Sequence, residues 1–491
     1  MATATAPLSE EHGERLQKGQ LSLRNCVALS AAVMAPVIAV ILNAPAAAGN
    51  GGAALPLAFL VAFIAIAFVA VSVIEFSRRL PTSGSFYTFV SHGLGGGAGF
   101  FTGWLYFAAF IMFAIGLFTA NGAFFHDYLQ SEWSANVPWW VLSLILMALV
   151  FALSIRSIKA SVRVDLALLG FEMAVFLLLA VIAIVRAHGG NSFHYFSPSA
   201  SPHHVKGVGL AAVFGILSFI GFESASVLGE ETRDAKRNIP KAVFGAMAII
   251  GAFYVFMMYS LAAGYHLNDP AQMKAFLGDS TPFPTIAHRY AHWLVQVIDI
   301  AAILGLFSCF LAVQNATVRV LFAMGRDRVL PPAMGKVHRS WHSPYAAIYT
   351  LTAFSVGAGL GLLAWLGSGL TDVYGWTGSL GTVAVILVYM LSCLASIRYF
   401  ARDPERSIVK HVILPLAGVA ALGYPLYFVA KPGQSYPYNL VPYLVLAWVV
   451  LGVAAYFYFR ATAPRKLAAI GRLIAEEEDD VAEGRLLSAP L

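Results

Sequence analysis

The sequence contains little charge: Asp, Glu, Lys and Arg together make up 11% of its 491 residues. Because a soluble protein carries about 25% charged residues, the composition excludes a soluble fold. Cysteine is also scarce, and Cys26, Cys309 and Cys393 have neither metal-ligand spacing nor the pattern of a disulfide framework. The sequence contains no Ser/His/Asp set, metal motif or phosphate-binding loop. We therefore expect no enzyme, no metal and no cofactor.

Apolar residues dominate instead, at 59% of the chain. A helix needs about 20 mostly apolar residues to cross a bilayer, and twelve segments satisfy this requirement. The predicted spans are 24–46, 54–77, 98–124, 137–155, 163–186, 208–229, 241–264, 293–323, 345–367, 373–399, 410–430 and 436–460. The sequence thus predicts an all-α integral membrane protein that contacts the lipid bilayer.

The distribution of Lys and Arg predicts the orientation. With the amino terminus inside, the inner segments carry 25 Lys and Arg residues and the outer loops carry five. Positive charge is retained on the cytoplasmic side of membrane proteins, so both termini are expected in the cytoplasm. The net charge of +6 then lies beside anionic lipid, and we expect no nucleic acid partner. We expect a multi-pass protein of the plasma (inner) membrane.

Two predicted spans contain residues that interrupt a helix. In the first, Pro36 removes a backbone donor and frees a carbonyl one turn earlier. In the sixth, Gly221 follows Ser218 and precedes Glu223, a carboxylate that costs about 2.5–3.5 kcal/mol at mid-membrane and must face protein or a water-filled cavity. Breaks in spans one and six are the positions expected for two five-helix units of opposite orientation.

This pattern divides the chain into five parts. They are a cytoplasmic tail (1–23), a first five-helix repeat (24–186), a second five-helix repeat (208–399), two additional helices (410–460) and a second cytoplasmic tail (461–491).

Three motifs resemble a known family. They are Arg79-Leu-Pro-Thr-Ser-Gly-Ser-Phe-Tyr-Thr after span two, Phe219-Ile-Gly-Phe-Glu223 leading to Asn238-Ile-Pro240, and Ala323-Met-Gly-Arg-Asp-Arg-Val-Leu-Pro331 after span eight. Together with twelve spans, they resemble the amino acid permease branch of the amino acid–polyamine–organocation (APC) superfamily. The resemblance covers roughly residues 20–460 and implies a leucine-transporter-type fold. Spans one, two, six and seven would form a bundle, and spans three, four, eight and nine a scaffold.

The resemblance also implies where a small-molecule substrate binds. Family members hold the ammonium of the substrate with carbonyls freed in the sixth span and its carboxylate with amides freed in the first. Tyr106 on span three and Tyr374 on span ten are candidates for the pocket wall or outer gate. The predicted substrate-binding residues are Met34, Ala35, Pro36, Val37, Ser218, Phe219, Ile220, Gly221, Tyr106 and Tyr374.

The first span departs from the family pattern. Most amino acid carriers have a Gly-Ser-Gly or Gly-Thr-Gly triplet there, which exposes three amide donors. This chain has Ala35-Pro36-Val37, and proline has no N–H. Weaker carboxylate recognition is expected, so an amine without a carboxylate is also a candidate substrate, as for polyamine and amine importers of the superfamily.

Two acids are candidates for proton coupling, Glu172 and Glu223. Glu172 aligns with a span-five lysine that occupies the sodium position in proton-coupled relatives. Because burial disfavours the charged form of a carboxyl group, Glu172 could exchange protons; alternatively, it packs against a neighbouring donor. Glu223 could relay protons or could support the loosened backbone. We expect Asp165 to lie near the inner surface and to offset Arg156, Lys159 or Arg163.

These observations predict a secondary active transporter for an amino acid or small amine, working by alternating access, with the proton favoured over sodium as the coupling ion. An antiporter that exchanges substrate for product, an amine importer and a sensor that binds without net transport are the alternatives. The protein would be a monomer or a homodimer.

Overall fold

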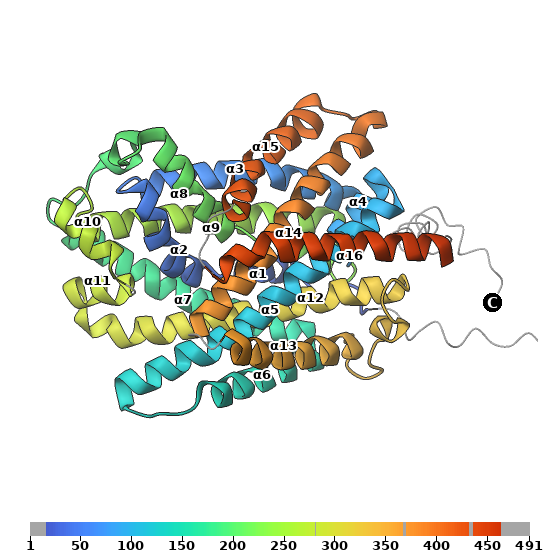
Figure 1. The fold of residues 1–491 in the computed structure, drawn as a ribbon, viewed down its shortest axis with the longest axis horizontal. Coiled ribbons are helices and arrows are strands. Elements are labelled where there is room, and N and C mark those ends of the chain that lie inside the picture. Colours follow the sequence, from blue (N-terminus) through green and yellow to red (C-terminus); the bar gives the residue numbers. More distant parts are fainter. Residues whose placement is uncertain (1–15, 280, 367–369, 432–435, 463–491) are drawn as a thin grey trace, which may run out of the picture.

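The computed structural model describes residues 16–279, 281–366, 370–431 and 436–462. Most of the two predicted tails, residues 1–15 and 463–491, lies outside this part. The described chain is helical (Figure 1), apart from one isolated bridge between Leu21 and Thr232. The α-helices are α1 (Leu23–Val33), α2 (Pro36–Gly51), α3 (Leu55–Arg79), α4 (Phe86–Leu94), α5 (Gly96–Trp133), α6 (Trp139–Arg156), α7 (Ile158–Arg186), α8 (His204–Ser218), α9 (Ala235–Tyr265), α10 (Pro270–Leu277), α11 (Pro282–Tyr290), α12 (Val295–Arg326), α13 (Tyr345–Leu366), α14 (Leu370–Tyr399), α15 (Leu414–Ala430) and α16 (Val441–Thr462).

Eleven helical segments of the described chain are long and apolar enough to cross a membrane, with α1 and α2 together making the first. The expected sixth span is not among them because it is broken. Its apolar helix α8 has 15 residues, and the short 3₁₀-helix η4 (Ser224–Leu228) follows after a turn. The prediction of an all-α, multi-pass membrane fold is confirmed. The division into two inverted repeats remains a prediction.

The packing separates the helices into the two expected groups. In one group, α3 packs on α8 and α9, α1 packs on α9, and α2 packs on α8. In the other group, α5, α6, α12 and α13 pack on one another. The broken helices α1/α2 and α8/η4 belong to the first group, and α1 also contacts α12 of the second. The broken helix α1/α2 therefore lies at the contact between the two groups.

Local sequence chemistry sets the helix ends. Helix α3 has Pro56 in its first turn, where a missing N–H costs no helix bond, and ends with Arg78 and Arg79, whose charges complement the carbonyl end of the helix. Helix α12 likewise ends with Arg326. Both helices end at the right-hand side of Figure 1, which we call the basic side. The Lys and Arg distribution predicts this side to be cytoplasmic.

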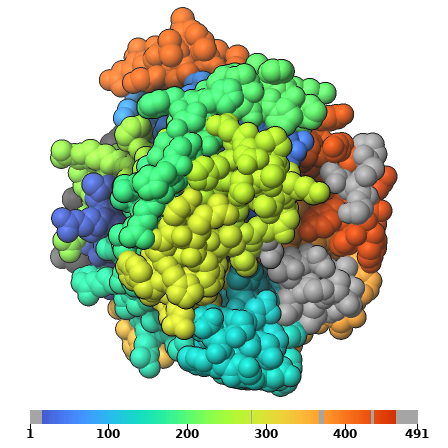
Figure 2. Space-filling view, turned by 90° about the vertical axis from the view of Figure 1, so that its left-hand side faces the viewer, coloured from blue at the N-terminus to red at the C-terminus, as the bar shows by residue number. Residues whose placement is uncertain are grey.

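Helices α10 and α11 lie at the opposite side of the molecule, and Figure 2 shows this end-on face, with both helices in yellow-green across its middle. Helix α15 lies at the top edge of the bundle in Figure 1, and α16 crosses the front of the bundle. The apolar window of α16 is only 11% buried, so most of its side chains are available to lipid. This agrees with the expectation that the last two spans are additions to the main bundle.

Candidate functional site

The first break separates α1 from α2 at Ala35. Proline at 36 disfavours helical geometry in the residue before it, and Ala35 adopts the left-handed conformation, with φ at 46°. This conformation costs an L-residue about 1–2 kcal/mol, so the surrounding structure must hold it. Helix α2 restarts at Pro36, and in the described chain the amides of Val37 and Ile38 have no backbone or side-chain acceptor. Two donors at the positive end of a helix are thus free for a ligand.

The second break follows Ser218, where α8 ends. The chain turns through Gly221, whose φ is 102°, before η4 begins. A Cβ atom at residue 221 would lie 2.3 Å from Cγ1 of Val33, the last residue of α1. Both the positive φ and the close approach therefore require glycine at this position. The predicted breaks in spans one and six are confirmed, and they touch each other.

Tyr254 of α9 links the two breaks. Its buried hydroxyl lies 2.8 Å from the carbonyl oxygen of Met34 and 2.8 Å from that of Ser218, and donates its one proton between them. Nearby, the side chain of Asn43 donates to the Ser218 hydroxyl at 2.8 Å. Tyr254 could not be recognised from the sequence, because a tyrosine within an apolar span usually only fills the core.

A cavity of about 440 Å³ lies against the two breaks. Of the predicted substrate-binding residues, Met34, Ala35, Ser218, Ile220 and Tyr374 line it. Pro36, Val37, Phe219 and Gly221 shape the breaks without lining the cavity, and Tyr106 also lies outside the lining. Contact of any of these residues with substrate remains a prediction.

The described residues that line this cavity include no Asp, Glu, Lys, Arg or His. Most are apolar or aromatic, such as Phe110, Phe113 and Phe214, and the polar side chains include Asn43 and Thr377. A buried charge needs a partner, and the polar groups available beside this cavity are the free backbone groups at the two breaks and a few uncharged side chains.

Glu223 lies directly after the second break and is fully buried. Tyr389 of α14 donates to its Oε2 at 2.5 Å, and Tyr106 of α5 donates to its Oε1 at 3.2 Å. The Tyr389 hydroxyl also accepts from the amide of Gly221 at 3.2 Å. Glu223 therefore connects the break to α5 and α14, as expected for a carboxylate that supports loosened backbone. Its predicted role in proton coupling remains a prediction.

Glu172 and Asp165 lie on α7 and are both buried, at 1% and 0% exposure. The position of Asp165 differs from our expectation. In the described chain it forms no ion pair with Arg156, Lys159 or Arg163, and Ser308 of α12 donates to it at 3.5 Å. Arg163 lies two residues away on the same helix, and residues at that spacing do not face each other.

A buried ionic cluster joins α12 to the chain that follows the second break. Arg319 of α12 bonds Glu231 through Nε at 2.5 Å and through Nη2 at 3.2 Å. Arg326 bonds Glu230 with two nitrogens, at 2.9 and 2.7 Å, and the amide of Ser83 also donates to Glu230. Ser83 belongs to the first motif of the family resemblance and Arg326 to the third, and Glu230 and Glu231 lie in the segment that leads from Glu223 to Asn238 in the second.

Burial alone would raise the pKa of the Glu230 carboxyl, but the Arg326 guanidinium and the Ser83 amide outweigh it and hold this pKa below its ordinary value. Glu230 is therefore charged across the physiological range. Arg319 was not singled out in the sequence, although a basic residue within a predicted span is a usable signal, because buried Arg is almost always paired.

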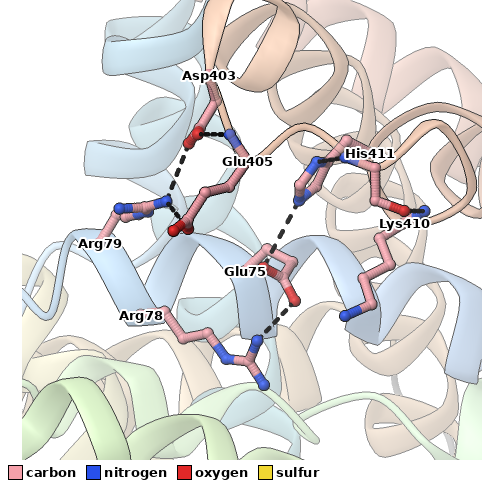
Figure 3. A network of polar contacts seen from close by, with 8 residues as sticks. Glu75, Arg78, Arg79, Asp403, Glu405, Lys410 and His411 are labelled. Atoms are coloured by element: carbon pink, nitrogen blue, oxygen red, sulfur yellow. Dashed lines mark hydrogen bonds and ion pairs between the residues drawn. The ribbon is translucent and has the colours of Figure 1, made fainter.

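A second polar network lies at the rim of the basic side (Figure 3). Arg79, at the end of α3, pairs with Asp403 and Glu405 at 3.1 Å each, and Nε2 of His411 lies 3.6 Å from Glu75. These contacts join α3 to the connection between α14 and α15. Because Arg79 is 46% exposed, each of its pairs is worth at most about 1 kcal/mol.

The two broken helices meet at a cavity inside a multi-pass helical bundle, and an ionic cluster lies between this cavity and the basic side. This arrangement defines a membrane transporter with a central site. Comparison with known proteins gives the family. The family model for amino acid permeases matches residues 28–429, and the chain belongs to this family, within the APC superfamily. Its fold is accordingly leucine-transporter-like, as the resemblance implied, and the protein is a permease for amino acids or amines rather than an enzyme.

Curated relatives match most of the chain. The chain is 25% identical over 441 residues to the methylthioribose transporter of Bacillus subtilis (strain 168), covering 85% of this chain and 88% of that one. It is 26% identical over 432 residues to the branched-chain amino acid permease BcaP of the same organism, covering 84% and 86%. It is 28% identical over 307 residues to the low-affinity putrescine importer PlaP of Escherichia coli (strain K12), covering 61% and 66%.

Proposed function

We propose that this permease takes up a small apolar amino acid together with a proton, by alternating access, and binds it between the two helix breaks. The observation that carries the proposal is the cavity of about 440 Å³, which is lined by Met34, Ala35, Ser218 and Ile220 from both breaks. Backbone groups there are free to recognise the two charged ends of an amino acid, and the apolar walls suit its side chain.

The amide of Ile38, which lines the cavity, is the proposed partner of the substrate carboxylate, together with the amide of Val37 in the same helical turn. They are the free donors of the first turn of α2, and a helix amino end favours negative charge. Pro36 supplies no third donor. The carbonyls of Val33 and Ile220 are the proposed partners of the ammonium group. The Ile220 carbonyl accepts no hydrogen bond in the described chain, and that of Val33 accepts only a weak one from Cys309 at 3.8 Å.

A diamine is the second candidate, because Ala35-Pro36-Val37 departs from the triplet of most amino acid carriers and because PlaP, a relative, is named a putrescine importer. The charge-free lining weighs against it. A second ammonium group in this cavity would be desolvated without an acidic partner, at a cost of several kcal/mol. An apolar side chain in the same place gains about 25 cal/mol for each Å² that it buries.

Glu172 is the proposed coupling group. It is buried, its Oε2 has no hydrogen-bond partner, and no Lys, Arg or His of the described chain pairs with it. A carboxyl group in this setting is far more stable neutral than charged. Proton uptake and release at Glu172 would therefore change the packing of α7 against α12, the helix that contacts α1 at the first break. Sodium is the less favoured coupling ion.

The predicted orientation places both termini and the closed basic side in the cytoplasm. The proposed direction of transport, which is uptake, follows from this orientation. The cavity lining extends to Phe124 and Tyr438, near the opposite side. We infer an outward-facing or occluded conformation, in which the ionic cluster around Glu230 and Glu231 must separate before substrate leaves inward.

Uptake into proteoliposomes tests the proposal with matched pairs that differ only in a carboxylate: leucine against isopentylamine, and ornithine against putrescine. An inward proton gradient should drive accumulation of leucine at least tenfold better than of isopentylamine, since each charged hydrogen bond is worth about 1.5–3 kcal/mol. Equal transport of both members of a pair would refute carboxylate recognition. Vesicles without internal substrate separate uptake from exchange, because an exchanger transports nothing into them. A sensor transports nothing into any of the vesicles.

A further inference from the structure

Asp165 and Glu172 lie on one face of α7, seven residues apart, which is about 10 Å along the helix. Their contacts on α12 are closer together. The Asp165 carboxylate meets the hydroxyl of Ser308 at 3.5 Å, and a Cβ atom at Gly305 would lie 1.7 Å from Oε2 of Glu172. Gly305 and Ser308 are three residues apart, about 4.5 Å along α12. The two acidic side chains therefore converge on one small area of α12.

Neither carboxylate has a cationic partner in the described chain. Oδ2 of Asp165 and Oε2 of Glu172 are buried without a hydrogen-bond partner. The ionisable groups that face the pair from neighbouring helices are Cys309 of α12 and Tyr254 of α9. Neither of these can neutralise a carboxylate as a cation.

The remaining helices packed on α7 add no counter-charge. Helix α2 contains no ionisable residue, and on α1 Arg24 is exposed while Cys26 contacts Thr232 at 3.2 Å. Arg156 of α6 is exposed near the end of its helix, as are His288 and Arg289 of α11. The nearest basic residue of α7 itself, Arg163, is also exposed.

Two buried carboxylates with no counter-charge cannot both be ionised, because each would lose several kcal/mol of hydration and they would also repel each other. A pair of this kind binds protons as one unit. The pair also lies one layer behind the cavity. Cys309, next to Ser308, lines the cavity and contacts the carbonyl of Val33, which lines it at the end of α1. Movement of α1 at the first break thus reaches the helix that both acids contact.

We propose that Asp165 and Glu172 form one proton relay, which rests on the proposed proton-coupled function and adds Asp165 as its second group. Glu172 receives the proton at mid-membrane, on the cavity side. The O–H bond on Glu172 then breaks as an O–H bond forms on Asp165, directly or through one water molecule, and the negative charge moves from Asp165 to Glu172. Asp165, two turns nearer the basic side, then releases the proton there.

The test compares wild type with Asp165→Asn, Glu172→Gln and the double variant in proteoliposomes, with the membrane potential clamped at zero and radiolabelled leucine as the probe. One proton per substrate predicts about tenfold accumulation for each unit of pH difference. Each single variant should lose this accumulation while leucine counterflow stays within about twofold, and the double variant should behave like the singles. Asp165→Glu, which keeps a carboxyl group, should restore accumulation. Asp299→Asn, an acid on α12 away from the pair, is the matched control and should behave as wild type.

Infrared titration of the reconstituted protein adds a readout that needs no substrate. The C=O stretching band of protonated carboxyl groups should be present in wild type and weaker in the double variant. In Asp165→Asn, the band of Glu172 should disappear at a pH lower by about one unit or more, because the charge of its neighbour is gone. Counterflow shows in the same samples that the variants are folded.

Three outcomes would overturn the relay, and they differ from failure of the proposed function. If Glu172→Gln loses gradient-driven accumulation but Asp165→Asn keeps it, Glu172 couples alone. If a sodium gradient drives accumulation and Asp165→Asn abolishes that, the pair holds a metal cation and the relay is wrong. An unshifted infrared band in Asp165→Asn likewise contradicts it. If wild type shows no accumulation with a pH gradient, proton coupling itself fails.

Discussion

The buried ion pair between Arg319 and Glu231 gives the sharpest prediction for the mechanism of closure. Both side chains are at most 4% exposed, and Arg319 also donates to the carbonyl oxygen of Asn315 at 2.8 Å. The pair fastens α12 to the chain that follows the second break. The perturbation is Arg319→Met, which keeps most of the side-chain volume and removes the charge.

Breaking a buried pair by removing one partner costs about 3–5 kcal/mol, because the remaining charge is left without compensation. Replacing both partners by well-packed apolar residues is often neutral. We therefore expect Arg319→Met to destabilise the closed basic side by about 3–5 kcal/mol, which is a change of about two to four powers of ten in its population. The double variant Arg319→Met/Glu231→Met should return to within about 1 kcal/mol of wild type.

Thiol labelling measures this change directly, because the three native cysteines are buried. A cysteine introduced at Thr82, which is 1% exposed at the basic side, should react slowly in wild type and much faster in Arg319→Met. Arg328→Met is the matched control: Arg328 is exposed at the end of α12, so this change should alter stability by less than about 0.5 kcal/mol.

A labelling rate that does not change in Arg319→Met would refute the role of the pair in closure. A double variant as fast as the single variant would refute the energetic argument, because the penalty would then not come from an unpaired carboxylate. Thermal unfolding of the same samples separates opening of the basic side from global unfolding.

Three further predictions concern other parts of the site. Tyr254→Phe removes the hydroxyl between the two breaks and should weaken substrate binding roughly fivefold, at about 1 kcal/mol for the one hydrogen bond that is lost; an unchanged Kd by equilibrium binding would contradict this. Gly305→Ala places a methyl group on the Glu172 carboxylate and should reduce proton-driven accumulation more than counterflow, so equal losses would argue for misfolding. Because its pKa is lowered when folded, Glu230 stabilises the closed side above its ordinary value of 4.5, and this stability is lost only as pH falls below it. Thr82→Cys labelling, divided at each pH by the labelling rate of an exposed thiol because only the thiolate reacts, should therefore be constant from about pH 8 to about pH 5 and rise in more acidic solution.

The helical framework and the two breaks could be predicted from the sequence because their causes are local. Pro36 cannot donate a helix bond, and Gly221 follows a serine and precedes a glutamate within an apolar run. Residues of this kind weaken a membrane helix locally, although Pro45 and Pro425 lie inside the continuous helices α2 and α15. The break positions in turn located the cavity, of which Met34 and Ser218 are part.

The partners of the breaks could not be predicted, because they depend on how distant helices rotate. Tyr254 and Tyr389 lie in apolar runs like any core tyrosine, and only the packing of α9 and α14 brings their hydroxyls to the breaks. Asp165 was misplaced for the same reason: nearby basic residues in the sequence suggested a surface ion pair, but its face of α7 points to α12. Arg319, by contrast, was visible in the sequence as a cation inside a span.

The described lining of the cavity carries no charged side chain. In the proposed site, backbone groups therefore recognise the charged ends of the substrate and side chains recognise its shape. Peptide groups at the breaks can hold the features that all amino acids share, and those groups survive most mutations. Wall residues such as Phe113 and Val313 can then vary freely, so a single substitution can change which cargo fits without disturbing how cargo is held. After gene duplication, a protein of this design can therefore diverge into carriers with different substrates.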